Sequence, residues 1–108
     1  MKTLIINGSP RKKGDTMYFI NKIKESIECD VVSAYYRDFS PCIDCRKCKG
    51  GECIYNDDMT ELLNNIDSYD NIIVATPLYY NQPTGVLMAM MSRTQMFFMS
   101  GKKLKEKK

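Results

Sequence analysis

Apolar and polar positions along the chain follow two different periods, which alternate from one segment to the next. Short runs of apolar, often β-branched residues predict β-strands at 3–6, 29–35 and 71–75. Apolar residues that recur every three or four positions predict helices at 16–27, 59–66 and 86–99. The apolar face of the first helix consists of Phe19, Ile20, Ile23 and Ile27.

Strands that alternate with helices predict an α/β fold with a parallel sheet and right-handed crossovers. Ligands of such sheets bind beyond the carboxyl ends of the strands. The loops at 8–16 and 76–85 both follow predicted strands, so we expect both at that edge. Residues 37–58 form a third loop without a clean period. Loops of this length in compact domains are usually functional.

Length and charge narrow the function classes. The chain has 108 residues, enough for one domain, which we place at 1–103 with a Lys-rich tail at 104–108. The net charge of +3 comes from the end of the chain, because residues 101–108 hold five Lys and one Glu. The remaining body is nearly neutral, which argues against a nucleic-acid partner. Without a membrane-spanning apolar run or a signal-peptide pattern, we expect a cytoplasmic protein with no membrane partner.

The loop at 8–16 has the form of a phosphate cradle. Amides of a loop and of a helix start favour an anion, and hydroxyl and basic side chains would add donors and charge. It matches neither the nucleotide-triphosphate pattern nor the dinucleotide pattern. The candidate ligand residues are Ser9, Arg11, Lys12, Gly14, Asp15 and Thr16. The alternative is an ordinary solvated turn, with Asp15 or Thr16 as the helix N-cap.

Four cysteines form a second constellation, with the spacing C-x2-C-x2-C-x4-C. They are Cys42, Cys45, Cys48 and Cys53. Four thiols within 12 residues of an intracellular chain are poor candidates for disulfides. Short spacings favour a [4Fe–4S] cluster over zinc, which usually joins two knuckles across a longer insert. Zinc and a loop of free thiols remain alternatives, and Cys29 is interpreted as a small buried apolar residue.

These motifs resemble those of flavodoxin-like NAD(P)H-dependent FMN reductases and of the iron–sulfur flavoproteins within that superfamily. In that family a Gly-Ser-Pro-Arg segment followed by Gly-Asn-Thr wraps the FMN phosphate; here Asp15 replaces the Asn. Thr76-Pro77-Leu78-Tyr79-Tyr80 resembles the segment that lies along the flavin ring. The resemblance implies ring contacts from Pro77, Leu78, Tyr79, Tyr80, Asn81 and Gly85. The alternative for the tyrosines is packing against the third helix.

The resemblance implies a flavodoxin-like three-layer α/β/α parallel sheet, of which this chain supplies three of five strands, in the order 2-1-3. Such an incomplete sheet would leave the apolar faces of the first and third helices partly uncovered. The chain would then be a truncated product, half of a split protein, or a homo-oligomer that covers its own sheet edge. An interface on the third helix is one use of its methionines. They are Met88, Met90, Met91, Met96 and Met99. The alternative is an ordinary core helix.

Three functions follow from the resemblance. The first is an FMN-dependent oxidoreductase that passes electrons from NAD(P)H to a small acceptor. The second is an electron carrier with FMN and a [4Fe–4S] cluster, fed by ferredoxin. The third is a non-catalytic remnant. The chain contains no His, and we identify no catalytic acid–base residue.

Overall fold

The sheet has three parallel strands, with the first strand in the centre. The computed structural model describes residues 2–50, 53–94 and 97. Strand β1 (Thr3–Asn7) pairs with β2 (Cys29–Ser33) on one side and with β3 (Asn71–Ala75) on the other. The order β2-β1-β3 is the one predicted from the sequence.

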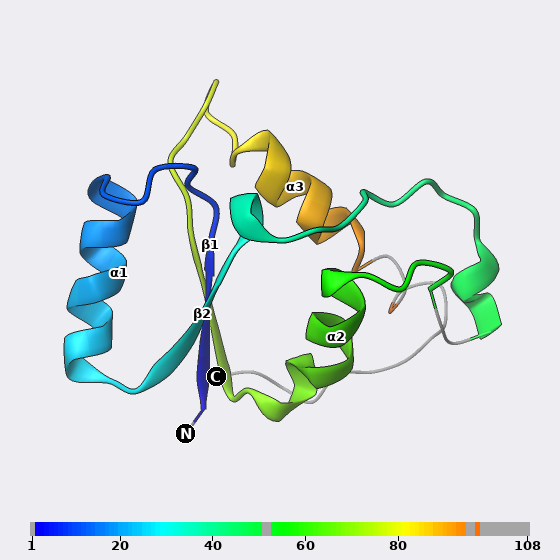
Figure 1. Cartoon of the computed structure of the whole chain (residues 1–108), viewed down its shortest axis with the longest axis horizontal. Helices are drawn as coiled ribbons and strands as arrows, with labels where there is room; N and C mark the ends of the chain where they lie inside the picture. Colours follow the sequence, from blue (N-terminus) through cyan, green and yellow to red (C-terminus); the bar gives the residue numbers. More distant parts are fainter. Residues whose placement is uncertain (1, 51–52, 95–96, 98–108) are drawn as a thin grey trace.

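Helices cover both faces of this sheet (Figure 1). Helix α1 (Asp15–Ser26) lies on one face, and α2 (Asp58–Asn65) and α3 (Gly85–Ser92) lie on the other. Three short 3-10 turns complete the described elements, η1 (Ala34–Tyr36), η2 (Lys47–Gly50) and η3 (Ile66–Ser68). The arrangement is the predicted three-layer α/β/α fold of the flavodoxin-like class.

The main core lies between the sheet and helices α2 and α3. It is built mainly from Leu4, Ile6, Val32, Ala34, Met59, Leu63, Leu87 and Met90. On the opposite face of the sheet, Ile20 of α1 is fully buried, as is Ile5 of β1. Every residue of β1 is buried, whereas Val74 of β3 is 47% exposed. The central strand is therefore covered as predicted, and β3 is an edge within the described part of the chain.

The apolar faces of α1 and α3 are partly uncovered, as expected for an incomplete sheet. Of the four residues on that face only Ile20 is buried, while Phe19 is 63% and Ile27 is 43% exposed. Two of the methionines on α3, Met88 and Met91, are also exposed, but Met90 is buried. The narrow three-stranded sheet explains this, because it offers too little surface to cover a whole helix face.

Several predicted boundaries need correction. Helix α1 begins at Asp15, and the predicted strand at 29–35 ends at Ser33 because the chain turns into η1. Helix α3 ends at Ser92 in place of Met99. Met96, Met99, the end of the domain at 103 and the tail at 104–108 lie outside the described residues. No helix in the described ranges is long and apolar enough to cross a membrane.

Candidate functional site

The two predicted flavin loops meet at the carboxyl edge of the sheet. Asn7 and Ala75 are register partners, so the residues that follow them lie side by side. The Gly8 amide donates a hydrogen bond to the Ala75 carbonyl (2.8 Å), and the buried Thr84 hydroxyl donates to the Gly8 carbonyl (2.6 Å). A Cβ on Gly8 would lie 2.7 Å from Leu87 Cδ2. Only glycine allows this close approach of the two loops.

Short-range hydrogen bonds shape the loop at 8–16. The buried side chain of Asn7 accepts a bond from the Ser9 amide (2.9 Å), and Ser9 Oγ accepts one from the Arg11 amide (3.2 Å). Ser9 is 3% exposed, while Arg11 and Lys12 are exposed. The exposed basic side chains remain available to an anion.

The start of α1 has no side-chain cap. Gly14 is the N-cap in an extended conformation and makes no side-chain cap hydrogen bond. The prediction that Asp15 or Thr16 caps the helix is therefore wrong, because the chain enters the helix one residue earlier. The first intrahelical bond runs from the Tyr18 amide to the Gly14 carbonyl (3.0 Å). The preceding first-turn amides have no intrahelical acceptor, which leaves a positive helix end for an anion.

The loop after β3 carries an exposed hairpin. Tyr79 and Gln82 exchange two backbone hydrogen bonds (2.9 and 3.0 Å), and Tyr80 and Asn81 form the two-residue turn with positive φ. Positive φ is uncommon for non-glycine residues and costs free energy. Tyr80 is fully exposed, so it does not pack against α3.

The remaining predicted residues of that loop are also accessible. Leu78 is 67% and Tyr79 is 47% exposed, Gly85 is exposed, and Pro77 is half-buried.

Tyr36 is a further residue at this edge that the sequence patterns did not single out. Its hydroxyl donates to the Pro10 carbonyl (2.5 Å), and Lys12 Nζ lies 5.0 Å from the centre of its ring. The predicted strand ended one residue before it, and no motif contains it. Its position just beyond a predicted strand end is the one local signal that it would contact the loop at 8–16.

All four clustered cysteines line a single pocket, together with Tyr55 and Arg93. Cys48 is buried, Cys42 and Cys53 are half-buried, and Cys45 is exposed. All five cysteines of the chain are free thiols, and Cys29 is half-buried rather than buried as predicted. Among the described residues, no three His, Cys, Asp or Glu side chains are gathered as the ligands of a metal ion. The four cysteines therefore line the same pocket, but in the described residues their sulfur atoms are not arranged as the ligands of one metal ion.

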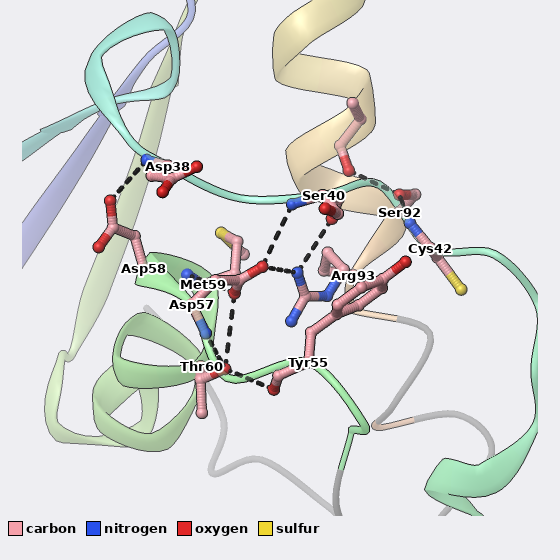
Figure 2. A network of polar contacts seen from close by, with 11 residues as sticks. Asp38, Ser40, Cys42, Tyr55, Asp57, Asp58, Met59, Thr60, Ser92 and Arg93 are labelled. Carbon is pink, nitrogen blue, oxygen red and sulfur yellow. Dashed lines mark hydrogen bonds and ion pairs between the residues drawn. The ribbon is translucent and has the colours of Figure 1, made fainter.

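The cysteine loop is tied to the end of α3 (Figure 2). The Cys42 amide donates to Ser92 Oγ (3.0 Å). Arg93 Nη1 donates to the Ser40 carbonyl (2.9 Å) and to Asp57 Oδ2 (2.6 Å). The side chain of Arg93 is 1% exposed and that of Asp57 is 16% exposed, so this ion pair is largely desolvated.

Asp57 also caps helix α2. Its Oδ1 accepts from the Met59 amide (3.1 Å), and Thr60 Oγ1 accepts from the Asp57 amide (3.0 Å), which makes a capping box. Burial alone would raise the pKa of Asp57, but hydrogen bonds from Arg93 and Ser40 and the charge of Arg93 hold that pKa below the ordinary value of 3.8. Asp57 therefore links the cysteine loop, α2 and α3 as a carboxylate.

Backbone geometry inside the cysteine loop is unusual around Cys45. Asp44 and Arg46, the residues on either side, both have positive φ (55° and 62°). The Asp44 amide donates to the sulfur of Cys42 (3.4 Å). This local winding brings successive cysteines to the same pocket, at a conformational cost of about 1 kcal/mol or more for each of the two residues.

The residues at both places fit the groups that the sequence resemblance implies. The loop at 8–16 offers an uncapped helix start, a buried hydroxyl and exposed basic side chains, which is the donor set for a phosphate. The cysteine pocket offers four thiols beside a buried guanidinium whose Nε and Nη2 have no hydrogen-bond partner among the described residues. That is the donor set of a sulfur-ligated metal group with a cationic neighbour.

A parallel β2-β1-β3 sheet with loops of this kind at its carboxyl edge defines a flavodoxin-like protein. The chain belongs to the NADPH-dependent FMN reductase family (FMN_red), whose family model matches residues 1–108.

Curated relatives carry the name iron-sulfur flavoprotein. One from Methanocaldococcus jannaschii is 33% identical over 101 residues, which is 88% of this chain and 52% of the relative. One from Archaeoglobus fulgidus is 29% identical over 112 residues, covering 99% of this chain and 55% of the relative. One from Clostridioides difficile is 34% identical over 101 residues, covering 85% and 45%. The chain therefore spans about half the length of the curated relatives it matches.

A solved structure of a flavin-binding protein has the same fold. The crystal structure of RosB with bound 8-demethyl-8-formylriboflavin-5'-phosphate superposes with a TM-score of 0.66 at 26% identity. The match covers 88% of this chain and 42% of RosB.

Proposed function

We propose that this chain is an FMN-binding oxidoreductase that transfers electrons from NAD(P)H through FMN to a small acceptor. The observation that carries the proposal is the open helix start of α1, which follows a loop with a buried Ser9 and exposed basic side chains. Membership of the FMN reductase family supports FMN as the anion that this cradle takes.

The residues divide between the two ends of the flavin. The phosphate would be held by Ser9, Arg11, Lys12, Gly14, Asp15 and Thr16. The ring would lie along Pro77, Leu78, Tyr79, Tyr80, Asn81 and Gly85. Bound FMN supplies the redox chemistry, whereas the protein fixes its orientation and its electrostatic surroundings. The hydrogen bonds that join Gly8 to Ala75 and Thr84 would keep the two ends at a constant separation.

A fluorescence titration with FMN tests the phosphate site. The Arg11→Ala variant should bind FMN about 10-fold more weakly than the unchanged protein, because a charge-assisted contact to phosphate contributes about 1.5 kcal/mol. The control is Lys24→Ala, in the last turn of α1. It removes the same charge at a site remote from the loop and should leave the affinity unchanged. Equal affinities of the Arg11 and Lys24 variants, or no FMN binding by the unchanged protein, would refute the proposal.

A second candidate function is an electron carrier with FMN and a [4Fe–4S] cluster held by Cys42, Cys45, Cys48 and Cys53, with ferredoxin as a partner. The gathering of all four thiols around one pocket favours it, as do relatives named iron-sulfur flavoproteins. Protein purified without oxygen should contain about four iron atoms per chain. The Cys45→Ser variant should lose iron and the broad visible band, whereas Cys29→Ser, outside the pocket, should keep both. Iron-free protein after anaerobic reconstitution would refute this second function.

A further inference from the structure

Arg93 is the most deeply buried charged residue among the described residues, and it is only partly satisfied. It follows the last turn of α3 and is 2% exposed. Its Nη1 donates to both Ser40 and Asp57, but Nε and Nη2 have no hydrogen-bond partner within the described part of the chain. Leaving a buried donor unpaired costs about 1–3 kcal/mol, and more when the group is charged. An unsatisfied buried group of this kind calls for an explanation, and an acceptor bound beside it is one.

Arg93 is one of the residues of the cysteine pocket. Arg93 lines that pocket together with Cys42, Cys45, Cys48 and Cys53. The ring of Tyr55 lies against the guanidinium, 4.8 Å from its centre to Cζ (Figure 2). The side chain of Cys53 lies within interaction distance of the guanidinium. The sulfur atoms of this pocket are therefore the candidates to accept the hydrogen bonds of Nε and Nη2.

The charges around the pocket also favour an anionic, sulfur-containing acceptor for Arg93. Asp57 balances the charge of Arg93 but engages only one of its nitrogens. Arg46 also lines the pocket, yet its side chain is 65% exposed and pairs with Asp44 on the surface. Of these two arginines, Arg93 is therefore the one whose positive charge lies in a desolvated environment. A thiolate-ligated iron cluster carries net negative charge, and hydrogen bonds to its sulfur atoms help set its reduction potential.

We propose that Arg93 is a positioning residue for the iron–sulfur cluster, an inference that rests on the second candidate function above. Its Nε and Nη2 donate hydrogen bonds to the Cys53 sulfur or to an adjacent cluster sulfur, while Nη1 is held by Asp57 and Ser40. These bonds stabilise the more negative, reduced cluster more than the oxidised one. Arg93 therefore raises the reduction potential, and it links occupancy of the pocket to the junction of α2 and α3.

The test compares Arg93→Gln and Arg93→Lys with Arg46→Gln in the full chain, after anaerobic reconstitution with iron and sulfide. Iron per chain is counted, and the midpoint potential of the cluster is measured by a redox titration followed by electron paramagnetic resonance. Arg93→Gln should move the midpoint to more negative values and lower the iron content. Arg93→Lys should shift it less, since the charge remains, and Arg46→Gln should shift it least although it removes the same charge from the same pocket.

A double variant covers the case in which Arg93→Gln does not fold because Asp57 is left without its counterion. The double substitution Arg93→Met, Asp57→Asn removes both charges and retains a side-chain cap on α2, because Asn caps helices as well as Asp does. If this folded variant, or folded Arg93→Gln, takes up iron with the midpoint potential of the unchanged protein, the role of Arg93 is refuted while the cluster stands. If the unchanged protein takes up no iron, the cluster and the role of Arg93 both fall. The FMN titration decides the first function independently.

Discussion

The phosphate loop at 8–16 and the cysteine loop at 37–57 both carry predicted ligand residues, but the protein holds them in different ways. The phosphate loop starts from the buried central strand and is fastened to β3 by the Gly8 amide and the Thr84 hydroxyl. The cysteine loop is largely exposed and is held at its ends by side chains of other elements, chiefly Asp57, Ser92 and Arg93. One loop is shaped by the sheet, whereas the other depends on a few long-range polar contacts.

This difference has a physical consequence for each loop. A loop fastened by backbone hydrogen bonds and close packing should keep its shape without a ligand. A loop held mainly by side-chain contacts around a buried ion pair, with two unsatisfied donors beside it, should depend on what occupies its pocket. The comparison can be tested by damaging each loop at its own attachment.

The largest effect is expected from Asp57→Asn. Asn retains the helix cap, but the buried charge of Arg93 loses its counterion, and breaking such a pair costs about 3 kcal/mol. The free energy of unfolding, measured with urea and circular dichroism, should fall accordingly. Asp44→Asn breaks a surface pair with Arg46 and should change that free energy by about 0.5 kcal/mol or less. Equal losses in the two variants would mean that the buried pair does not hold the cysteine loop.

Gly8→Ala should have the next largest effect, at the phosphate loop. The new methyl group would lie 2.7 Å from Leu87 Cδ2 and 2.9 Å from Thr76 Oγ1, and such overpacking costs about 2 kcal/mol. It should also weaken FMN binding, because the two loops would be pushed apart. Gly50→Ala, where nothing lies within 4 Å, is the matched control for stability. A Gly8 variant as stable as this control would show that the loops are not held by close packing.

The smallest effect is a difference in response to acid. Because the pKa of Asp57 is lowered in the folded protein, its contribution to stability is complete above 3.8. That contribution is lost as the pH falls through the lower folded pKa. Between about pH 5 and pH 3, Asp57→Asn should therefore show a shallower fall in melting temperature than the unchanged protein. Parallel curves would contradict the inferred charge on Asp57.

Much of the fold was accessible from the sequence. The alternation of apolar runs and helical periods predicted the order of the six main elements, and β3 has the predicted bounds. The strand order was implied by the family resemblance and is confirmed. The errors lie at element ends, as at Ser33 and Gly14, where backbone conformation rather than periodicity decides. The exposure of Phe19 and Ile27 was not visible in the period either, because it depends on how wide the sheet is.

The candidate site was predictable only in part. Local spacing identified the loop at 8–16, the loop at 76–85 and the four cysteines. Tyr36, Thr84 and Arg93 escaped notice, since each acts on a partner remote in the chain. The hydrogen bond from Arg93 to Ser40 spans 53 positions, and the one from Thr84 to Gly8 spans 76.

The sequence by itself determined the class of fold, the edge at which the loops gather and the chemistry of the thiols. Periodicity and spacing are local properties, and both can be read directly from the sequence. Only the tertiary structure decided that one of the four arginines is buried beside those thiols with two donors unpaired among the described residues. Burial changes the free energy of a charge far more than residue type does, and it arises only when distant segments pack together.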